Sequence, residues 1–383
     1  KRKNARLQSL CQESLEEPLE VLQDRAMGAL TDEDVCFDLK WLQKLYPGVP
    51  AHVMAQVPVP AVEDGERLPW SRRQRRTWKT CKGVVLHLFC GGSRNMLKGK
   101  LPSGYEVLEV DVQENVLNLA VASFLTLLAH TGQLKAIIGG PPCRTWSRCR
   151  HNDLEEESAP RPLRDSGKHR WGFPDLTFAE KGLLERDAVM YLRMLHLYDI
   201  AEARRLSQGK EEFQTMFLLE NPTDPVEVTK QPKDSKGRQY VSFWRSPEWG
   251  SFRSRHQTVL HRVFQGALGH RKPKPTTLAL AGMSLPDWVE GLNQLYQVEG
   301  HKEVSPRPAV GSQGFLGQSS AWAEWAPGLK QAICEAVERG LRQDPSIRHI
   351  SARERVAREF EAHLRADHLP FRRDCEVCLA GAL

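Results

Sequence analysis

The sequence predicts an α/β fold, a doubly wound and mostly parallel sheet of the Rossmann type with helical N- and C-terminal extensions. Between residues 84 and 219, short apolar runs typical of buried strands alternate with segments of helical pattern. Glycine, proline or acidic residues directly follow several of these runs, as expected where parallel strands end beside a ligand. With 383 residues, 40% of them hydrophobic, the chain can bury a sizeable core.

The expected elements follow one another in a regular order. Leucines at helical spacing predict one or two helices in residues 1–50, and the Pro- and Arg-rich residues 47–82 predict a linker or arm. Strands are expected at Val84–Phe89, Tyr105–Val110, Leu134–Ile138 and Met216–Leu219. Helical patterns cover Val116–His130, a segment from Thr177 to about Leu206, Trp322–Leu341 and residues 344–365.

Local signals sharpen some of these boundaries. Thr177 and Glu180 form the capping-box pattern that opens the long helix. Residues 144–175 are rich in Arg, Pro and Gly and are expected to form a long loop. Residues 223–290 interleave aromatic and basic residues and are expected to be irregular.

Charge and cysteine content limit the setting of the protein. The net charge of +6 is compatible with a polyanionic partner without requiring one. Six basic residues precede the first strand and form either a solvated face or a nucleic-acid contact: Arg72, Arg73, Arg75, Arg76, Lys79 and Lys82. Nine scattered cysteines, with no signal peptide and no bilayer-length apolar run, predict a reducing, nuclear or cytoplasmic compartment and no membrane partner.

The end of the first strand and the end of the second carry a cofactor-type pattern. The turn is formed by Phe89, Cys90, Gly91, Gly92 and Ser93. Its glycines would let the backbone approach a cofactor closely, although a plain strand-to-helix turn needs them as well. Glu109 and Asp111 close the next strand, where an acid accepts hydrogen bonds from ribose hydroxyls or caps the following helix.

A nucleophile and an acid follow the next two strands. Residues 139–147 read GGPPCRTWS, in which two prolines hold the Cys143 thiol in one orientation and two glycines leave room for a planar ring. A lone cysteine is more often a small buried apolar residue, but its place on a Pro-Pro turn after a buried strand favours chemistry. Glu220, Asn221 and Pro222 end the last strand, and a glutamate there is costly to bury unless it is paired or protonated. A capping or salt-bridged acid is the alternative.

This set of motifs resembles the cytosine carbon-5 methyltransferases. LFCGG is similar to their Phe-x-Gly-x-Gly, Glu109 stands at their ribose-binding acid, GGPPCRTWS is similar to GGPPCQPFS, and ENP is similar to ENV. The resemblance spans about residues 84–225 and implies the methyltransferase version of the Rossmann fold. It also implies that Cys143 attacks carbon 6 of a cytosine while Glu220, followed by Asn221, contacts ring nitrogen 3.

The resemblance further implies a cofactor, S-adenosylmethionine, and a nucleic-acid substrate, with DNA favoured over RNA. The residues that would bind the cofactor are Phe89, Cys90, Gly91, Gly92, Ser93, Glu109, Asp111, Gly140 and Pro141. A base within a duplex would have to flip out to reach the thiol.

Several positions depart from the family pattern. Ser93 replaces the last glycine of the turn, and Arg144 replaces the glutamine after Pro-Pro-Cys. The base-binding arginine of the family's Gln-x-Arg-x-Arg is best approximated by Arg262, with Gln257 before it, while Arg271 and Lys274 are further basic candidates. Residues 311–320 stand where the family has Gly-Asn-Ser-Val, and little chain remains for target recognition. Two alternatives therefore stay open: an inert nucleic-acid-binding module, and an RNA cytosine methyltransferase.

The last residues carry four zinc-type ligands: His363, His368, Cys375 and Cys378. A histidine-bearing helix followed by a thiol pair is the alternative. The segment resembles the His-His-Cys-Cys module that precedes retrotransposon integrases, which implies a structural zinc ion and a piece of a retroelement polyprotein. The predicted organisation is a helical, basic extension (1–82), a methyltransferase-like domain (83–340) and a helix with a zinc knuckle (341–383).

Overall fold

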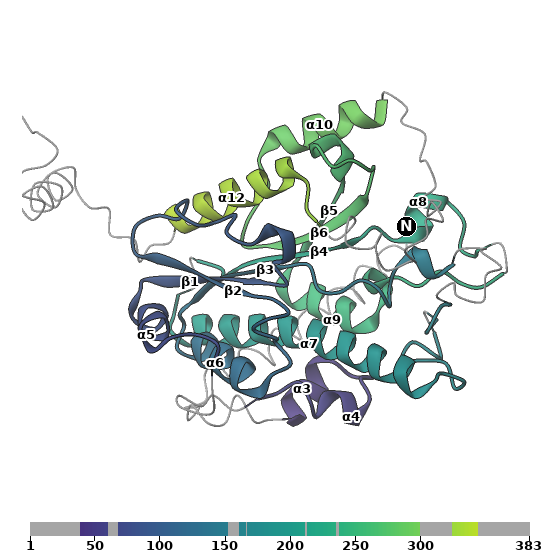
Figure 1. Ribbon diagram of the computed structural model, residues 1–383, viewed down its shortest axis with the longest axis horizontal. Coiled ribbons are helices and arrows are strands. Elements are labelled where there is room, and N and C mark those ends of the chain that lie inside the picture. The colour runs from purple at the N-terminus through teal and green to yellow at the C-terminus, as the bar shows by residue number, and fades with distance from the viewer. Residues whose placement is uncertain are drawn as a thin grey trace, which may run out of the picture. The chain divides into compact units, whose positions relative to one another are not determined.

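The computed structural model describes residues 39–59, 68–151, 161–165, 167–210, 213–234, 237–298 and 324–343 (Figure 1). The chain divides into two compact units, residues 1–341 and residues 342–383. The fold below is that of the first unit. The helix expected at residues 344–365 and the leucines before residue 39 lie outside the described residues.

A six-stranded, mostly parallel sheet forms the centre of this unit, which confirms the predicted α/β, Rossmann-like architecture. The strands are β1 (Gly83–Leu88), β2 (Tyr105–Val110), β3 (Leu134–Gly139), β4 (Met216–Pro222), β5 (Val259–Phe264) and β6 (Pro275–Ala281). Their order is β2-β1-β3-β4-β6-β5. The first four are parallel, and β6 runs antiparallel to both β4 and β5.

The first four strands were expected, whereas β5 and β6 fall in the stretch expected to be irregular. β5 is an edge strand with mostly half-exposed side chains and therefore lacks a buried strand's continuous apolar run. The same stretch also contains helices α8 (Pro225–Thr229), α9 (Pro247–His256) and most of α10 (Asp287–Val298). Its interleaved aromatic residues are core, since Phe243, Trp249 and Phe252 are all buried.

Helices cover both faces of the sheet, as a doubly wound fold requires (Figure 1). α6 (Leu119–His130) and α7 (Phe178–Ser207) lie on one face, and α10 and α12 (Pro327–Arg342) lie on the other. Successive residues of β4 face opposite layers. The Met216 sulfur lies so close to Gly340 of α12 that no Cβ would fit there, while the Phe217 ring packs on Tyr198 of α7. Glu220 therefore belongs to the α12 face and Asn221 to the α7 face.

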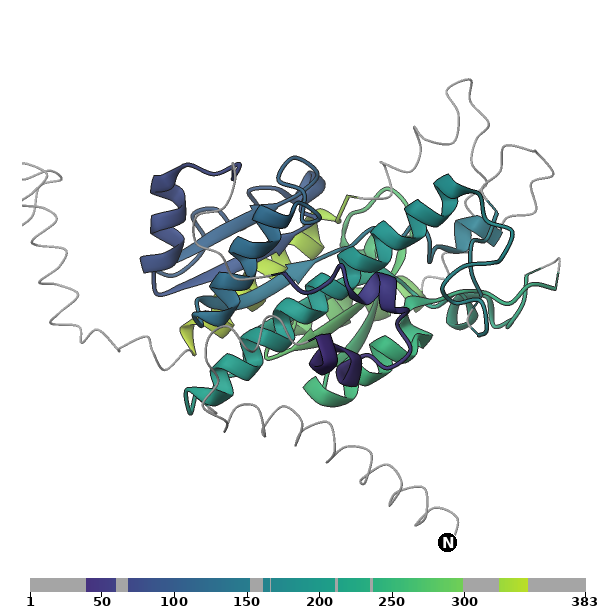
Figure 2. The same cartoon turned by 90° about the horizontal axis from the view of Figure 1, so that it is seen from below.

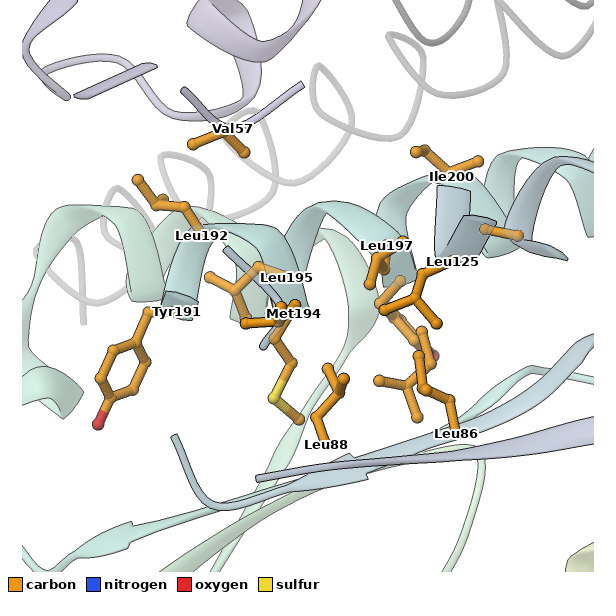
Figure 3. Close-up of a cluster of buried hydrophobic side chains, with 14 of the residues drawn as sticks. Val57, Leu86, Leu88, Leu125, Tyr191, Leu192, Met194, Leu195, Leu197 and Ile200 are labelled. Carbon is orange, nitrogen blue, oxygen red and sulfur yellow. The ribbon is translucent and has the colours of Figure 1, made fainter. Parts of the chain in front are cut away.

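The long helix α7 begins as the sequence predicts. Thr177 and Glu180 form a complete capping box, in which each side chain accepts a hydrogen bond from the other residue's backbone N–H. Its buried face supplies much of the core: Figure 3 shows Met194 and Leu195 between the helix and Leu88 of β1. Figure 2 shows α7 lying beside α6 across the sheet. Among the described residues, no helix has the length and apolar character needed to cross a membrane.

The described parts of residues 47–82, a segment expected to be a linker or arm, contain helices. α5 (Arg72–Thr80) starts with a capping box of Ser71 and Gln74 and packs by Trp78, whose Nε1–H donates to the Val107 carbonyl at 3.1 Å. Trp78 is the one buried side chain of this otherwise polar and basic helix. α5 ends three residues before β1 begins, so its C-terminal end lies at the amino-terminal edge of the sheet. That end of the basic cluster therefore lies at the edge opposite the predicted catalytic residues.

The described part of the N-terminal extension packs on the same core. α3 (Leu39–Leu45) and α4 (Ala51–Met54) lie against α9 and α7, and Trp41, Leu42 and Tyr46 are buried. Tyr46 donates a hydrogen bond to Asp199 of α7, a carboxylate that also pairs with Arg255 and His256 of α9. This buried polar cluster joins three helical segments.

Candidate active site

The strand register brings the predicted motifs to one edge of the sheet. Gly139, the last residue of β3, is the register partner of Leu88 in β1 and of Leu219 in β4. The next residue on each strand is therefore at the same level: Phe89, Gly140 and Glu220. Segments separated by about fifty and eighty residues of sequence thus begin side by side at the carboxyl ends of three adjacent parallel strands.

The two glycines of the Gly-Gly-Pro-Pro-Cys turn are required by close packing. A Cβ at Gly139 would stand 2.6 Å from the Leu88 carbonyl oxygen. A Cβ at Gly140 would stand 2.8 Å from Oε2 of Glu220 and 3.4 Å from Nε1 of Trp325. The Glu220 carboxylate therefore lies directly against the backbone of the turn, three residues before Cys143.

Glu220 is 8% exposed and is held by one of its two oxygens. Oε1 accepts a hydrogen bond from Gln265 Nε2 at 3.1 Å and faces the Thr276 hydroxyl at 3.5 Å. The Lys274 ammonium lies 3.6 Å from the same oxygen, so the buried charge is paired. Of the basic candidates in the sequence, Lys274 is the one in contact with the predicted acid, and Arg271 is exposed.

Tyr191 of α7 contacts Asn221, the residue after the predicted acid, and the turn before Cys143. Asn221 donates a hydrogen bond through Nδ2 to the Tyr191 hydroxyl, which in turn lies 3.5 Å from the Pro141 carbonyl oxygen. Burial raises the pKa of Tyr191 well above its ordinary value, and the proximity of Cys143 and Glu220 raises it further. No motif in the sequence marks Tyr191, which lies within an apolar helix face.

The residues after Cys143 are anchored on α7. Arg144, which is mostly exposed and replaces the family's glutamine, forms a bidentate ion pair with the buried Asp187, with Nη2 to Oδ1 at 2.8 Å. Burial raises the pKa of Asp187, and the Arg144 guanidinium counteracts only part of that rise. Trp146 packs edge-on against Tyr191, and the buried Arg164 guanidinium stacks 3.9 Å from the Trp146 ring. The turn is therefore rigidly attached on the side that follows the thiol.

The glycine turn after β1 is attached to the end of β2. The Gly91 N–H donates to Oδ2 of Asp111 at 3.1 Å, and the Asn95 N–H donates to Oε1 of Glu109 at 2.6 Å. Burial raises the pKa of Glu109, but the nearby His87 and the Asn95 N–H together hold it below its ordinary value. Phe89 and Gly91 both have positive φ, at 57° and 44°. The predicted acids thus lie beside the predicted turn.

The same turn leaves space beside its backbone. The space beside Gly91, where a side chain would point, is open for 4 Å. Among the described residues no donor contacts Oε2 of Glu109, which leaves that oxygen available to a ribose hydroxyl. Ser93 is buried and bonds through its N–H to the Cys90 carbonyl, so its hydroxymethyl group does not project into solvent.

Two further residues of the turn have structural roles. Burial raises the pKa of the Cys90 thiol to about 11, which makes it a poor nucleophile at neutral pH. The Gly92 carbonyl accepts a hydrogen bond from Lys330 of α12 at 2.9 Å. α12, through Lys330 and the preceding Glu324 and Trp325, therefore packs against the turn and the neighbouring Gly140.

The described contacts of the predicted site residue Arg262 do not include Glu220 or the Cys143 turn. Arg262 lies on the edge strand β5, opposite Thr277, which itself pairs with Asn221. The Arg262 guanidinium is partly exposed and lies 3.7 Å from Glu227 of α8. Arg262 therefore lies on the same face of the sheet as Asn221 and at the same level along the strands, but two strands away. Gln257 is the left-handed C-cap of α9.

The predicted zinc ligands His363, His368, Cys375 and Cys378 lie outside the described residues, as do residues 311–320. Within the described ranges no cluster of three or more His, Cys, Asp or Glu side chains could hold a metal ion. The zinc segment stays a prediction. Comparison of the chain with models of known protein families and with curated proteins gives no match.

Proposed function

We infer that this chain methylates carbon 5 of cytosine in nucleic acid, with DNA the favoured substrate and S-adenosylmethionine the methyl donor. The observation that supports this best is the position of the Glu220 carboxylate against Gly140, three residues before Cys143. A thiol and a carboxyl group at one edge are the pair that nucleophilic addition to a cytosine ring uses.

Each residue has a defined part in this reaction. The Cys143 thiolate attacks carbon 6, and the displaced electron pair moves into the ring toward nitrogen 3, where Glu220 stabilises it by a hydrogen bond or a proton. S-adenosylmethionine, held by the glycine turn and Glu109, would supply the methyl group to carbon 5. S-adenosylhomocysteine would leave, and water would accept the proton from carbon 5. The ring double bond then re-forms as the Cys143 thiolate departs, and nitrogen 3 returns any proton it received to Glu220. A duplex substrate would present the base by flipping it out of the stack.

Covalent trapping tests this function. Duplex DNA carrying 5-fluorocytosine is incubated with the protein and S-adenosylmethionine, and adducts are counted on a denaturing gel. Fluorine replaces the proton that must leave carbon 5, so the Cys143 adduct persists. We expect an adduct with the wild-type chain and none with Cys143→Ser. Cys81→Ser, which changes a partly buried thiol at the opposite edge of the sheet, should leave trapping intact.

The other candidate functions predict different outcomes. An adduct on 5-fluorocytosine RNA alone would identify an RNA methyltransferase. Measurable S-adenosylmethionine binding with no adduct on either nucleic acid would contradict catalysis and favour the inert binding module.

A further inference from the structure

The two oxygens of Glu220 have different environments. Gln265, Lys274 and Thr276 all approach Oε1, at 3.1, 3.6 and 3.5 Å. Among the described residues no donor reaches Oε2, which lies beside Gly140. One oxygen is therefore occupied by the protein, and the other borders the turn that carries Cys143.

The orientation of Gln265 is fixed by its own partners. Its side chain is fully buried, and its Oε1 accepts a hydrogen bond from the Ala326 N–H at 2.9 Å. The amide nitrogen must then face the other way, where it donates to Glu220 and to the Thr276 hydroxyl at 2.9 Å. A flipped amide would place two oxygens together and an N–H against an N–H, so Gln265 can act only as a donor to Glu220.

Lys274 occupies an unusual backbone position for a lysine. Its φ of 38° is in the left-handed region, where any side chain other than glycine costs about 1 kcal/mol or more. Its ammonium nonetheless is buried, donates to the Glu324 carbonyl at 3.0 Å and faces Oε1 of Glu220. A glycine would avoid the strain but would leave Glu220 without its buried cation.

We propose that Lys274 and Gln265 are positioning residues for the acid: they hold Oε1 of Glu220 and thereby direct Oε2 to ring nitrogen 3 of the cytosine. This proposal rests on the proposed function. Lys274 and Gln265 prevent rotation of the Glu220 carboxyl group about its terminal bond. Gly140, which lies beside Oε2, has no side chain that could do so. The substrate contact is thereby confined to a single oxygen.

The test is the single-turnover rate of adduct formation on 5-fluorocytosine DNA. Lys274→Met removes the cation and keeps the apolar stem, and we expect the rate constant to fall at least tenfold while DNA affinity and S-adenosylmethionine binding stay within twofold. Lys274→Arg should recover most of the rate. Equal rates for Lys274→Met and wild type would overturn the proposal, as would a loss confined to binding or thermal stability.

A double-variant cycle guards against misfolding, because Glu220→Gln removes the charge that Lys274→Met would leave unpaired. If Lys274 acts through Glu220, the lysine change should alter the rate less than twofold in the Glu220→Gln background. An undiminished tenfold loss there would contradict positioning. Absence of any wild-type adduct would instead refute the proposed function itself, so the two failures are distinguishable.

A modified base gives an independent readout. DNA with 2-pyrimidinone at the target lacks the electron-donating amino group at carbon 4, so carbon 6 is more electrophilic and addition needs less help from an acid. We expect the defect of Lys274→Met to shrink to less than threefold on this base. A defect of the same size on both bases would show that the lysine does not act through Glu220.

Discussion

Glu220 and Asp199 are both buried carboxylates with a buried cation beside them, but their hydrogen bonding differs. Asp199 is fully buried, and both of its oxygens are occupied: Oδ2 by Tyr46, and Oδ1 by Arg255 at 3.1 Å and His256 at 2.6 Å. Glu220 is saturated at Oε1 only and keeps Oε2 beside the Cys143 turn. Both carboxylates satisfy the need of a buried charge for a partner.

Their hydrogen bonding gives Asp199 a structural role and leaves Glu220 able to contact a ligand. Asp199 joins α7 to α9 and to the residue after α3, so its hydrogen bonds are used to hold the N-terminal segment on the core. Glu220 lies near the carboxyl end of β4 and beside Gly140, and no donor from the described part of the chain reaches its Oε2. Within the described ranges, an oxygen that accepts no hydrogen bond, rather than burial or charge, distinguishes Glu220 from Asp199.

The largest effect should come from Glu220→Gln. The amide oxygen can still accept from Gln265 and Lys274, but the side chain no longer transfers a proton, so we expect adduct formation to slow about 10²- to 10⁴-fold. Single-turnover trapping measures this loss. Because the buried Lys274 ammonium then loses its countercharge, the melting temperature should fall as well, and the rate is compared per folded molecule. A fall in stability without a fall in rate would remove the distinction between the two carboxylates.

Asp199→Asn should produce the opposite pattern. It leaves the buried Arg255 guanidinium without its countercharge, which costs about 3–5 kcal/mol of unfolding free energy. Urea unfolding measures the loss, and trapping at low temperature measures activity per folded molecule, which should be unchanged. A slow adduct rate in a fully folded variant would show that the Asp199 cluster also supports the site.

Acid should weaken the Asp199 cluster in a defined range. Burial raises the pKa of Asp199, but Arg255 and His256 outweigh it and lower the pKa to about 2. An unfolded aspartate has a pKa of about 3.9. The contribution of Asp199 to the free energy of unfolding is therefore complete above that pH and is lost as the pH falls through the pKa of the folded state. It is on the order of 2 kcal/mol, with roughly half gone at pH 3.

Urea unfolding of wild type and Asp199→Asn between pH 7 and pH 3 measures this contribution. The stability difference between the two should narrow as pH falls. A constant difference would mean that Asp199 has the same pKa in the folded and unfolded chains.

The smallest expected effects come from a matched pair of hydroxyl deletions, Tyr191→Phe and Tyr46→Phe. Each removes a buried hydroxyl that bonds one polar side chain, Asn221 or Asp199, and each should cost about 1–3 kcal/mol of stability. Tyr191→Phe should also slow adduct formation about tenfold, equivalent to about 1.4 kcal/mol, because Asn221 and the Pro141 turn lose their common partner. Equal rates in the two variants would argue that Tyr191 has only a packing role.

The sequence by itself determined the first four strands and the start of α7, and it predicted that the motifs after β1, β3 and β4 meet at one edge of the sheet. Tyr105–Val110 forms a strand with the predicted bounds, and Thr177 with Glu180 forms the predicted capping box. These features depend on hydrophobic periodicity and on contacts three residues apart, which can be read locally. The parallel arrangement of successive strands then placed the ends of β3 and β4 at one edge.

Tertiary structure alone decided which groups surround the acid. Gln265, Lys274 and Ala326 reach Glu220 or one another across 45 to 61 residues of sequence, and the stretch that provides the first two was expected to be irregular. Their roles depend on an antiparallel strand inserted beside β4 and on α12 packing over the glycine turn. Local patterns carry no information on such long-range pairings, because the side chains become partners only after the sheet has formed its order and register.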